Sequence, residues 1–233
     1  MRSGAPNEFR RQEKEMSRNL LDVATKHEWH NIRWFRRMAP VYDIVEIFAR
    51  HIREKVVSDS DLSPGARVLD MACGTGSQSI AFAKYGFSVV GVDLSPDMLA
   101  RAKKKIRKGY DVTFLCQDAS SIPYADSHFD LATVSFGLHD MPEGIGVAVL
   151  REMRRVTKPD GKIVIVDYDV PQNSLPAFLG HAVAKTWESK YYDRFLEVGL
   201  QHYLGEAELS AQEKENFIFA NIQKVICTNR KRA

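Results

Sequence analysis

Apolar runs and amphipathic stretches follow one another in a regular order over the middle of the chain. The runs are rich in β-branched residues, which is typical of buried strands, and the stretches between them have the apolar spacing of helices. Strands are predicted at residues 67–70, 88–93, 112–116, 129–135 and 162–167, and helices at 77–84, 95–108 and 144–156. This alternation predicts the α/β class, with a doubly wound, mostly parallel sheet and helices on both faces.

The part before this pattern is charged and helical in character. We expect residues 1–64 to form an N-terminal helical cap or lid, and residues 65–233 to form the main domain. A basic and aromatic segment around residues 29–37 suits either peripheral contact with a membrane surface or an acidic partner, or a helix packed on the domain with its arginines in water. The second interpretation is favoured, and Tyr42 opens a further predicted helix that runs to about Val57.

The part after the pattern is less regular. Residues 171–209 are longer than a simple crossover and rich in aromatic residues, so they are expected to form a helical insertion over the main domain. A last helix is predicted at about 209–221 and a strand at 223–229, followed by four polar residues that cannot supply a core strand. We therefore expect the sheet to have six strands, with residues 223–229 directly beside the strand at 162–167.

The amino-acid composition excludes only a few classes of protein. The 233 residues carry 33 basic and 30 acidic side chains, a net charge of +3, so binding to nucleic acid is not favoured. The three cysteines are scattered without metal-ligand spacing, which predicts no metal site and a reducing, cytoplasmic location. No apolar run approaches the roughly 20 residues of a membrane span, and oligomeric state is left open.

The chemistry is concentrated between Arg67 and Gly76, where an apolar strand meets a turn with two glycines before a helix. Such a turn lets the backbone approach a nucleotide closely. Ser79 stands where a dinucleotide fold would have its third glycine, which disfavours an NAD-type oxidoreductase. Asp93 ends the next apolar run 19 residues after Gly74 and is placed to accept hydrogen bonds from ribose hydroxyls.

The stretch Asp70-Met-Ala-Cys-Gly-Thr-Gly76 resembles the cofactor loop of the class I S-adenosylmethionine (SAM) methyltransferases. The resemblance covers about residues 40–170, and the run from Leu150 to Gly161 is typical of the branch with the ubiquinone and menaquinone C-methyltransferases. It implies a Rossmann-like methyltransferase fold that uses SAM and releases S-adenosylhomocysteine. That family has a last antiparallel strand, which this chain is expected to lack.

The resemblance also implies residue roles. Asp70 with the backbone of Ala72 and Gly74 would hold the methionine part of SAM, and Asp93 the ribose. The adenine would lie between Leu94 and Met98, with Asp118 accepting from its amino group. The remaining residues assigned to the cofactor are Thr75, Gly76, Ala119 and Ser135, and a tyrosine at the position of Tyr42 closes over the cofactor in this branch.

The sequence indicates the residues that would contact the methyl acceptor less clearly. His139 follows the strand at 129–135 and is either a general base or a polar wall of the pocket. Asp167 and Tyr42 are weaker candidates for a catalytic role. The predicted function is methyl transfer to a small molecule (quinone-like, phenolic or amine). The alternatives are an RNA or protein methyltransferase, and a SAM-binding protein without catalysis.

Overall fold

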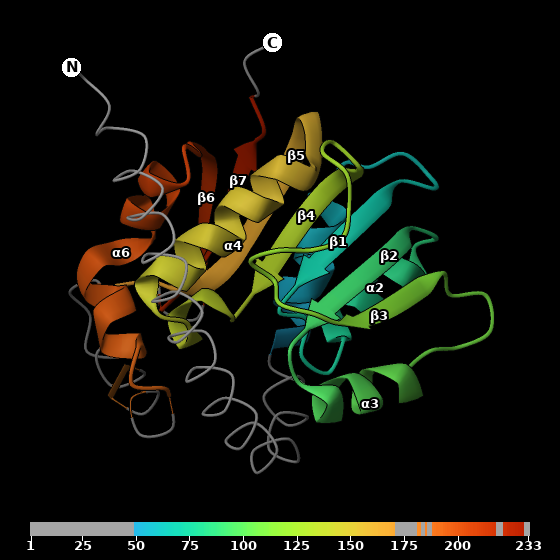
Figure 1. The fold of residues 1–233 in the computed structure, drawn as a ribbon, viewed down its shortest axis with the longest axis horizontal. Helices are drawn as coiled ribbons and strands as arrows, with labels where there is room; N and C mark the ends of the chain where they lie inside the picture. Colours follow the sequence, from blue (N-terminus) through green and yellow to red (C-terminus); the bar gives the residue numbers. More distant parts are fainter. Residues whose placement is uncertain (1–48, 171–180, 183–184, 186–187, 218–220, 231–233) are drawn as a thin grey trace, which may run out of the picture.

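The computed structural model describes residues 49–170, 181–182, 185, 188–217 and 221–230, and these form a sheet between layers of helices (Figure 1). Within the described residues the sheet has seven strands in the order β3-β2-β1-β4-β5-β7-β6. The strands are β1 (Arg67–Met71), β2 (Ser88–Asp93), β3 (Val112–Cys116), β4 (Phe129–Ser135), β5 (Thr157–Tyr168), β6 (Ala211–Phe217) and β7 (Ile222–Thr228). The predicted α/β class and mostly parallel sheet are confirmed.

Strands β1 to β5 run parallel, and β7 runs antiparallel to both β5 and β6. The strand order reverses at the centre of the sheet, because β1 pairs with β2 on one side and with β4 on the other. Ligands of open α/β sheets bind outside the carboxyl ends of the strands at such a switch point. The fold therefore directs attention to the carboxyl ends of β1, β2, β4 and β5.

Apolar side chains on the two faces of the strands form two cores, because successive residues of a strand point to opposite sides. Leu69 and Met71 of β1 join one core with α4 and α6, whereas Val68 joins the other with the helix at residues 49–58 and with α2. Figure 1 shows α4 on one side of the sheet and α2 on the other. The remaining helices complete these layers: α2 (Ser77–Lys84), α3 (Pro96–Lys104), the short 3₁₀ helix η1 (Leu138–Asp140), α4 (Glu143–Val156) and α6 (Tyr192–Glu206).

The expectation of a missing strand is wrong. Residues 223–229 do pair directly with β5, as predicted, but as the antiparallel strand β7, with Ile163 opposite Cys227. The segment predicted as the last helix forms the edge strand β6 instead, paired with β7. Its sequence from Ala211 to Phe217 is charged and mostly exposed, which is how proteins protect a sheet edge from pairing with other chains. The sheet is thereby complete with seven strands.

The ends of α3 and β5 have local causes in the sequence. Ser95 caps α3 by accepting a hydrogen bond from the backbone N–H of Met98 at 3.3 Å, with Pro96 at the first helical position. Strand β5 begins at Thr157, before the predicted start at residue 162, and contains a bulge at Asp160, which has a φ of 61° where the register with β4 shifts.

The structure describes only part of the expected N-terminal cap and of the expected insertion. Residues 49–58 form a helix, as predicted for the end of the cap, whereas residues 1–48 and 171–180 lie outside the described part. Of the expected insertion, α6 is described; its backbone is interrupted at Gly199, which has a φ of 73°.

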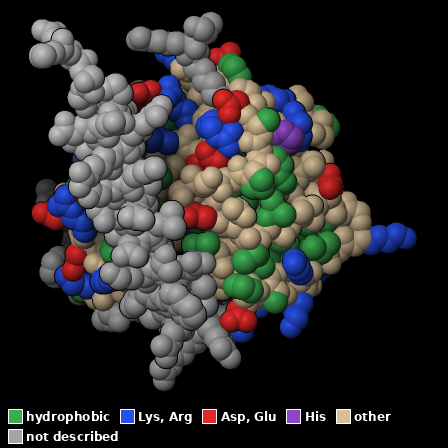
Figure 2. All heavy atoms as spheres, viewed as in Figure 1, with side chains coloured by type: hydrophobic (Ala, Val, Ile, Leu, Met, Phe, Trp, Pro, Cys, Tyr) green, Lys and Arg blue, Asp and Glu red, His purple; other side chains and the backbone are tan. Residues whose placement is uncertain are grey.

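One sheet face is covered unevenly. Val90, Leu115 and Tyr124 are only partly buried against the core that contains α4, and Figure 2 shows apolar side chains gathered on this side of the molecule beside the grey atoms.

Among the described residues, no helix is long and apolar enough to cross a membrane.

Candidate functional site

Four polar residues lie at or next to the carboxyl ends of neighbouring strands: Asp70 on β1, Asp93 on β2, Ser135 on β4 and Asp167 on β5. The pairing of β1 with β2 and β4, and of β4 with β5, brings these ends to one edge of the sheet. The sequence predicted all four as site residues. The structure therefore gathers the predicted cofactor side and the predicted acceptor side at the switch point of the fold.

The loop after β1 has an unusual backbone. Ala72, Gly74 and Gly76 have φ values of 51°, 53° and 75°, in the left-handed region that side chains disfavour. A Cβ on Gly74 would meet nothing within 4 Å, whereas a Cβ on Gly76 would lie 2.6 Å from Cζ of Phe114. Gly76 is thus required by packing, and Gly74 faces open space where a ligand can approach the backbone.

Asp70 is buried at the end of β1, with 1% of its surface exposed. Its Oδ2 accepts a hydrogen bond from Ser79 Oγ at 2.5 Å. Burial raises the pKa of Asp70 to about 7, against the opposing effect of that hydrogen bond. The sequence predicted only that Ser79 replaces a glycine; the structure adds that its hydroxyl fixes the carboxyl group of Asp70.

Asp93 holds the loop from the side of β2. Its Oδ2 accepts a hydrogen bond from the backbone N–H of Gly74, and its Oδ1 one from the backbone N–H of Ser95, each at 2.8 Å. Burial raises the pKa of Asp93, and the two backbone hydrogen bonds oppose this. A carboxylate oxygen can accept more than one hydrogen bond, so each oxygen retains capacity for a hydroxyl of a ligand.

The other residues assigned to the cofactor lie around this loop. Met98 is buried and Leu94 half-buried after β2, while Asp118 and Ala119 follow β3. Oδ1 of Asp118 accepts hydrogen bonds from the N–H and the hydroxyl of Ser120, each at 2.8 Å. Thr75 is buried and accepts a hydrogen bond from Lys105 Nζ at 2.9 Å, which points to a role in fixing the loop.

His139 lies at the centre of a buried cluster on η1. Its Nδ1 is 2.6 Å from Oδ1 of Asp167, and its Nε2 is 3.1 Å from Oε2 of Glu188. Burial alone would lower the pKa of His139, but the negative charges of Asp167 and Asp140 outweigh it and hold the pKa well above its usual range. Both ring nitrogens are engaged in this arrangement, and such a ring is a poor general base.

Asp167 organises the loop after β4. Its Oδ2 accepts hydrogen bonds from the backbone N–H groups of Leu138 and His139, at 3.0 and 3.4 Å. The loop begins at Phe136, whose φ of 54° is in the left-handed region; a residue held there costs about 1–3 kcal/mol and is common at functional sites. Asp167 thus positions η1 and does not itself face open space, since none of its surface is exposed.

Aromatic rings surround His139 on the side of α6. Its ring centroid lies 4.8 Å from that of Tyr168, 6.0 Å from Tyr192 and 6.4 Å from Phe195. Tyr192 and Phe195 are 2% and 1% exposed, so these aromatic residues of the expected insertion serve as core. Tyr42 lies outside the described residues, and the hydroxyl of Ser135 is buried without a hydrogen-bond partner among those that are described.

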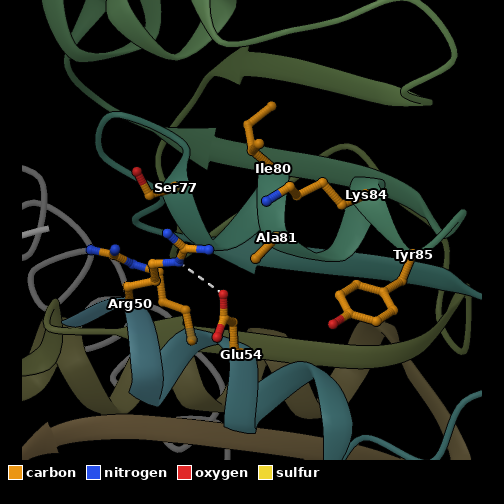
Figure 3. Close-up of a pocket in the computed structure, with 8 residues that line it drawn as sticks. Arg50, Glu54, Ser77, Ile80, Ala81, Lys84 and Tyr85 are labelled. Carbon is orange, nitrogen blue, oxygen red and sulfur yellow. Dashed lines mark hydrogen bonds and ion pairs between the residues drawn. The ribbon is translucent and has the colours of Figure 1, made fainter. Parts of the chain in front are cut away.

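A separate hollow of about 490 Å³ runs along the outer side of α2 (Figure 3). Arg50, Arg53 and Glu54 of the helix at residues 49–58 line one wall, and the rest of the lining comes from α2 and Tyr85. Neither the acidic residues at the strand ends nor His139 contribute to it, so the hollow is distinct from the site described above.

Comparison with known proteins agrees with this geometry. The sequence model of a methyltransferase domain matches residues 68–161. The demethylmenaquinone methyltransferase of Renibacterium salmoninarum is 40% identical over 161 residues, which cover 67% of this chain and 65% of that protein, just under two thirds of its length. The 2-phytyl-1,4-naphtoquinone methyltransferase of Synechocystis is 33% identical over 207 residues, covering 81% of this chain and 85% of the relative.

The chain belongs to the SAM-dependent methyltransferases. The family fold agrees as well: the PH0226 protein of Pyrococcus horikoshii superposes with a TM-score of 0.62 at 25% identity, over 78% of this chain and 91% of that one. SAM is the cofactor of this family. The residues present suit it, because Gly74 leaves open space and the carboxyl groups of Asp70 and Asp93 flank the loop, where they complement the positive charge of SAM.

Proposed function

We propose that this methyltransferase transfers the methyl group of SAM to a small acceptor with a quinone-like ring. The observation that supports it best is the junction of two groups of side chains at one edge of the sheet: Asp70 and Asp93 on the cofactor side, and the loop from Ser135 to His139 on the acceptor side. The ring class comes from the relatives, whose names specify demethylmenaquinone and phytyl-naphthoquinone as substrates.

The proposed roles on the cofactor side follow from the hydrogen bonds already present. Asp93 would bind the ribose hydroxyls with the remaining lone pairs of its two oxygens, while continuing to hold the N–H groups of Gly74 and Ser95. Asp70 would pair with the ammonium group of the methionine part, Leu94 and Met98 would flank the adenine, and Asp118 with the backbone of Ala119 would bind its edge. The bound cofactor supplies an activated methyl group, so the protein contributes mainly alignment.

On the acceptor side, we propose that His139 is a positioning residue rather than a general base. Both of its ring nitrogens are already engaged, Nδ1 by Asp167 and Nε2 by Glu188. The hydroxyl of Ser135 has no hydrogen-bond partner among the described residues, and we propose that it donates to the bound ligand. The N-terminal segment with Tyr42 and the insertion at 171–209 are proposed as the lid that excludes water.

The decisive experiment combines cofactor binding with product detection. Calorimetric titration with SAM is expected to show one site, and Asp93→Ala is expected to weaken it at least tenfold, since hydrogen bonds to a charged group contribute about 1.5–3 kcal/mol each. Asp93→Asn, which keeps one acceptor oxygen, should retain part of the affinity. Asp111→Ala is the matched control, because Asp111 is an exposed aspartate before β3.

Turnover is then measured by mass spectrometry with a naphthoquinol, a simple phenol and a primary amine as acceptors. We expect a methylated naphthoquinol together with an equal amount of S-adenosylhomocysteine. Binding of SAM without any product would support a binding protein, and preference for the amine would overturn the proposed acceptor class. Tight binding of NAD in place of SAM would overturn the proposal as a whole.

A further inference from the structure

Three potential metal ligands converge beside the proposed acceptor site. His139 and Asp140 lie next to each other on η1, and Glu188 comes from a segment 49 residues after His139. One donor atom of each residue lies within 4.8 Å of the others. The sequence predicted no metal site, because the third residue of this set is distant along the chain and leaves no local ligand spacing.

Asp140 is the residue that calls for an explanation. It is 3% exposed, and neither oxygen of its carboxyl group has a hydrogen-bond partner within the described part of the chain. The nearby hydroxyl of Ser189 opposes the burial that raises the pKa of Asp140, but it donates its hydrogen bond to the carbonyl oxygen of His139 at 3.3 Å. Buried polar groups in proteins are nearly always paired, and an unpaired buried carboxylate is costly. The nearest counter-charge is Nε2 of His139 at 3.6 Å, which is too long for a hydrogen bond. The carboxyl group therefore faces a position that a cation would satisfy.

Hydrogen bonds from further residues orient the side chains of His139 and Glu188, as is usual for metal ligands. Asp167 Oδ1 lies 2.6 Å from Nδ1 of His139, which turns Nε2 toward Asp140 and Glu188. The hydroxyl of Tyr168 donates a hydrogen bond of 2.6 Å to Oε1 of Glu188 and leaves Oε2 directed at His139. A carboxylate behind a histidine and a hydrogen bond to a ligating carboxylate are the common supports of metal sites.

The distances suit a small cation. Ligand atoms about 2.0–2.1 Å from a tetrahedral metal lie about 3.3 Å from one another. Nε2 of His139 is 3.1 Å from Oε2 of Glu188 and 3.6 Å from Oδ2 of Asp140, so both separations differ from that value by only a few tenths of an ångström. All three donor atoms lie within 4.8 Å of one another, so the side chain of Asp140 or Glu188 has to rotate to bring the two carboxylate oxygens to the same ion.

We propose that His139, Asp140 and Glu188 bind one divalent transition-metal ion, Zn²⁺ or Mn²⁺. One imidazole and two carboxylates form a mixed donor set that suits these ions better than Ca²⁺, which takes six to eight oxygens at longer distances. Three protein ligands leave a coordination position open. The open position would bind an oxygen of the acceptor and favour its ionised form; this role rests on the proposed function, whereas the metal site itself does not.

A proton could hold part of the cluster together instead. A protonated His139 bonds Asp167 and Glu188 simultaneously, and the structure is compatible with that arrangement. It leaves the carboxyl group of Asp140 without a partner, however, which is the feature that the metal would satisfy. The two interpretations differ in whether Asp140 contributes to the affinity for a cation, and this difference can be measured.

The test uses the full chain after dialysis against EDTA, without SAM or acceptor. Titration calorimetry with ZnCl₂ and with MnCl₂ is expected to show saturable binding of one equivalent of at least one of the two ions, with CaCl₂ weaker than either. That ion should also raise the melting temperature, because it binds the folded state. Asp140→Asn should weaken binding at least tenfold, and Asp111→Asn, a matched change at an exposed aspartate, should leave it as in the wild type.

Glu188→Gln provides a second variant, which decides the question if Asp140→Asn does not fold as judged by circular dichroism. It too should weaken binding at least tenfold. Absence of saturable binding to the wild type, or equal affinity in the variants and in the Asp111→Asn control, would overturn the metal site. Because neither SAM nor acceptor is present, such a result leaves the proposed methyl transfer untouched.

Discussion

The carboxyl group of Asp70 makes the stability of the cofactor-free protein depend on pH. Burial raises its pKa to about 7 in the folded state, whereas an unfolded aspartate has a pKa of about 3.9. Between these values the folded state binds the proton more tightly, so the contribution of Asp70 to stability is complete below about pH 4 and is lost as the pH rises through about 7. Asp70→Asn, which cannot ionise, removes this loss.

We therefore expect Asp70→Asn to gain stability relative to the wild type as the pH is raised from 5 to 8. Urea denaturation at the two pH values without SAM measures the difference in the free energy of unfolding. A parallel pH dependence in both proteins would show that Asp70 ionises in the folded state as easily as in the unfolded chain.

Ser79 should matter most when Asp70 is charged. Its hydroxyl donates the 2.5 Å hydrogen bond to Asp70 Oδ2 and is fully buried. Ser79→Ala is expected to destabilise the protein by about 1–3 kcal/mol at pH 8, the cost of leaving a buried acceptor unpaired, and by less at pH 5. Denaturation of Ser79→Ala, of Asp70→Ala and of the double variant tests this, because alanine at position 70 has no acceptor, and a loss from Ser79→Ala that persists there would not come from that hydrogen bond.

The sequence predicted the individual site residues to different degrees, for reasons that are physical. Asp70 and Asp93 could be found because each ends an apolar strand, and strand ends meet at one edge of a parallel sheet. Glu188 could not be found, because it joins His139 only through the packing of the segment before α6. The charge of His139 likewise depends on that packing, so its role as base or wall was left open.

At the scale of elements, the two glycines of the cofactor loop should respond differently to the same change. A Cβ on Gly76 would lie 2.6 Å from Phe114 and 2.7 Å from Ala102, whereas one on Gly74 meets nothing within 4 Å. Both have positive φ values, so Gly74→Ala carries only the backbone strain of about 1–2 kcal/mol.

Gly76→Ala adds a steric clash with side chains of β3 and α3, and we expect it to lose at least about 1 kcal/mol more, in the range typical of overpacked cores. Thermal denaturation of the two variants provides the comparison, and each serves as the control for the other. Equal losses would mean that Phe114 moves aside without cost.

The elements that the sequence predicted well are those whose burial determines their composition. Strands β2 and β4 match the predicted bounds, because buried strands consist of apolar runs. Strand β3 also matches, through its β-branched and aromatic residues, although it is a partly exposed edge strand. Strand β6 was mistaken for a helix because an edge strand carries charged residues, and Gln212, Glu213 and Lys214 have no strand-like pattern. Only its pairing with β7 makes it a strand.

At the scale of the whole molecule, the first described helix is tied to the last strand by an ion cluster around the buried side chain of Lys224. Lys224 on β7 is 3% exposed at its side chain, and its Nζ contacts Asp59, which follows the helix at residues 49–58, and Glu215 of β6 at 2.7 Å. Asp59 also accepts a hydrogen bond from Lys55 Nζ at 2.9 Å. The cluster fixes the helix layer against the antiparallel end of the sheet.

Asp59→Ala should therefore cost more stability than the loss of an ordinary surface ion pair. It leaves the ammonium group of Lys224 buried with only Glu215, and hydrogen bonds to charged groups contribute about 1.5–3 kcal/mol. Glu54→Ala is the matched control, because Glu54 pairs with Arg50 on the same helix in an exposed position, where such pairs contribute about 0.3–0.5 kcal/mol.

The additional loss of stability in Asp59→Ala, relative to Glu54→Ala, should also depend on pH. Burial would raise the pKa of Asp59, but Lys224 and Lys55 outweigh it and hold the pKa below its ordinary value of 3.8. The excess loss is thus complete at neutral pH and disappears as the pH falls through that lowered pKa. Urea denaturation of both variants at pH 7 and pH 3 measures the two effects, and equal losses for Asp59→Ala and Glu54→Ala at pH 7 would show that the helix is held by its apolar face alone.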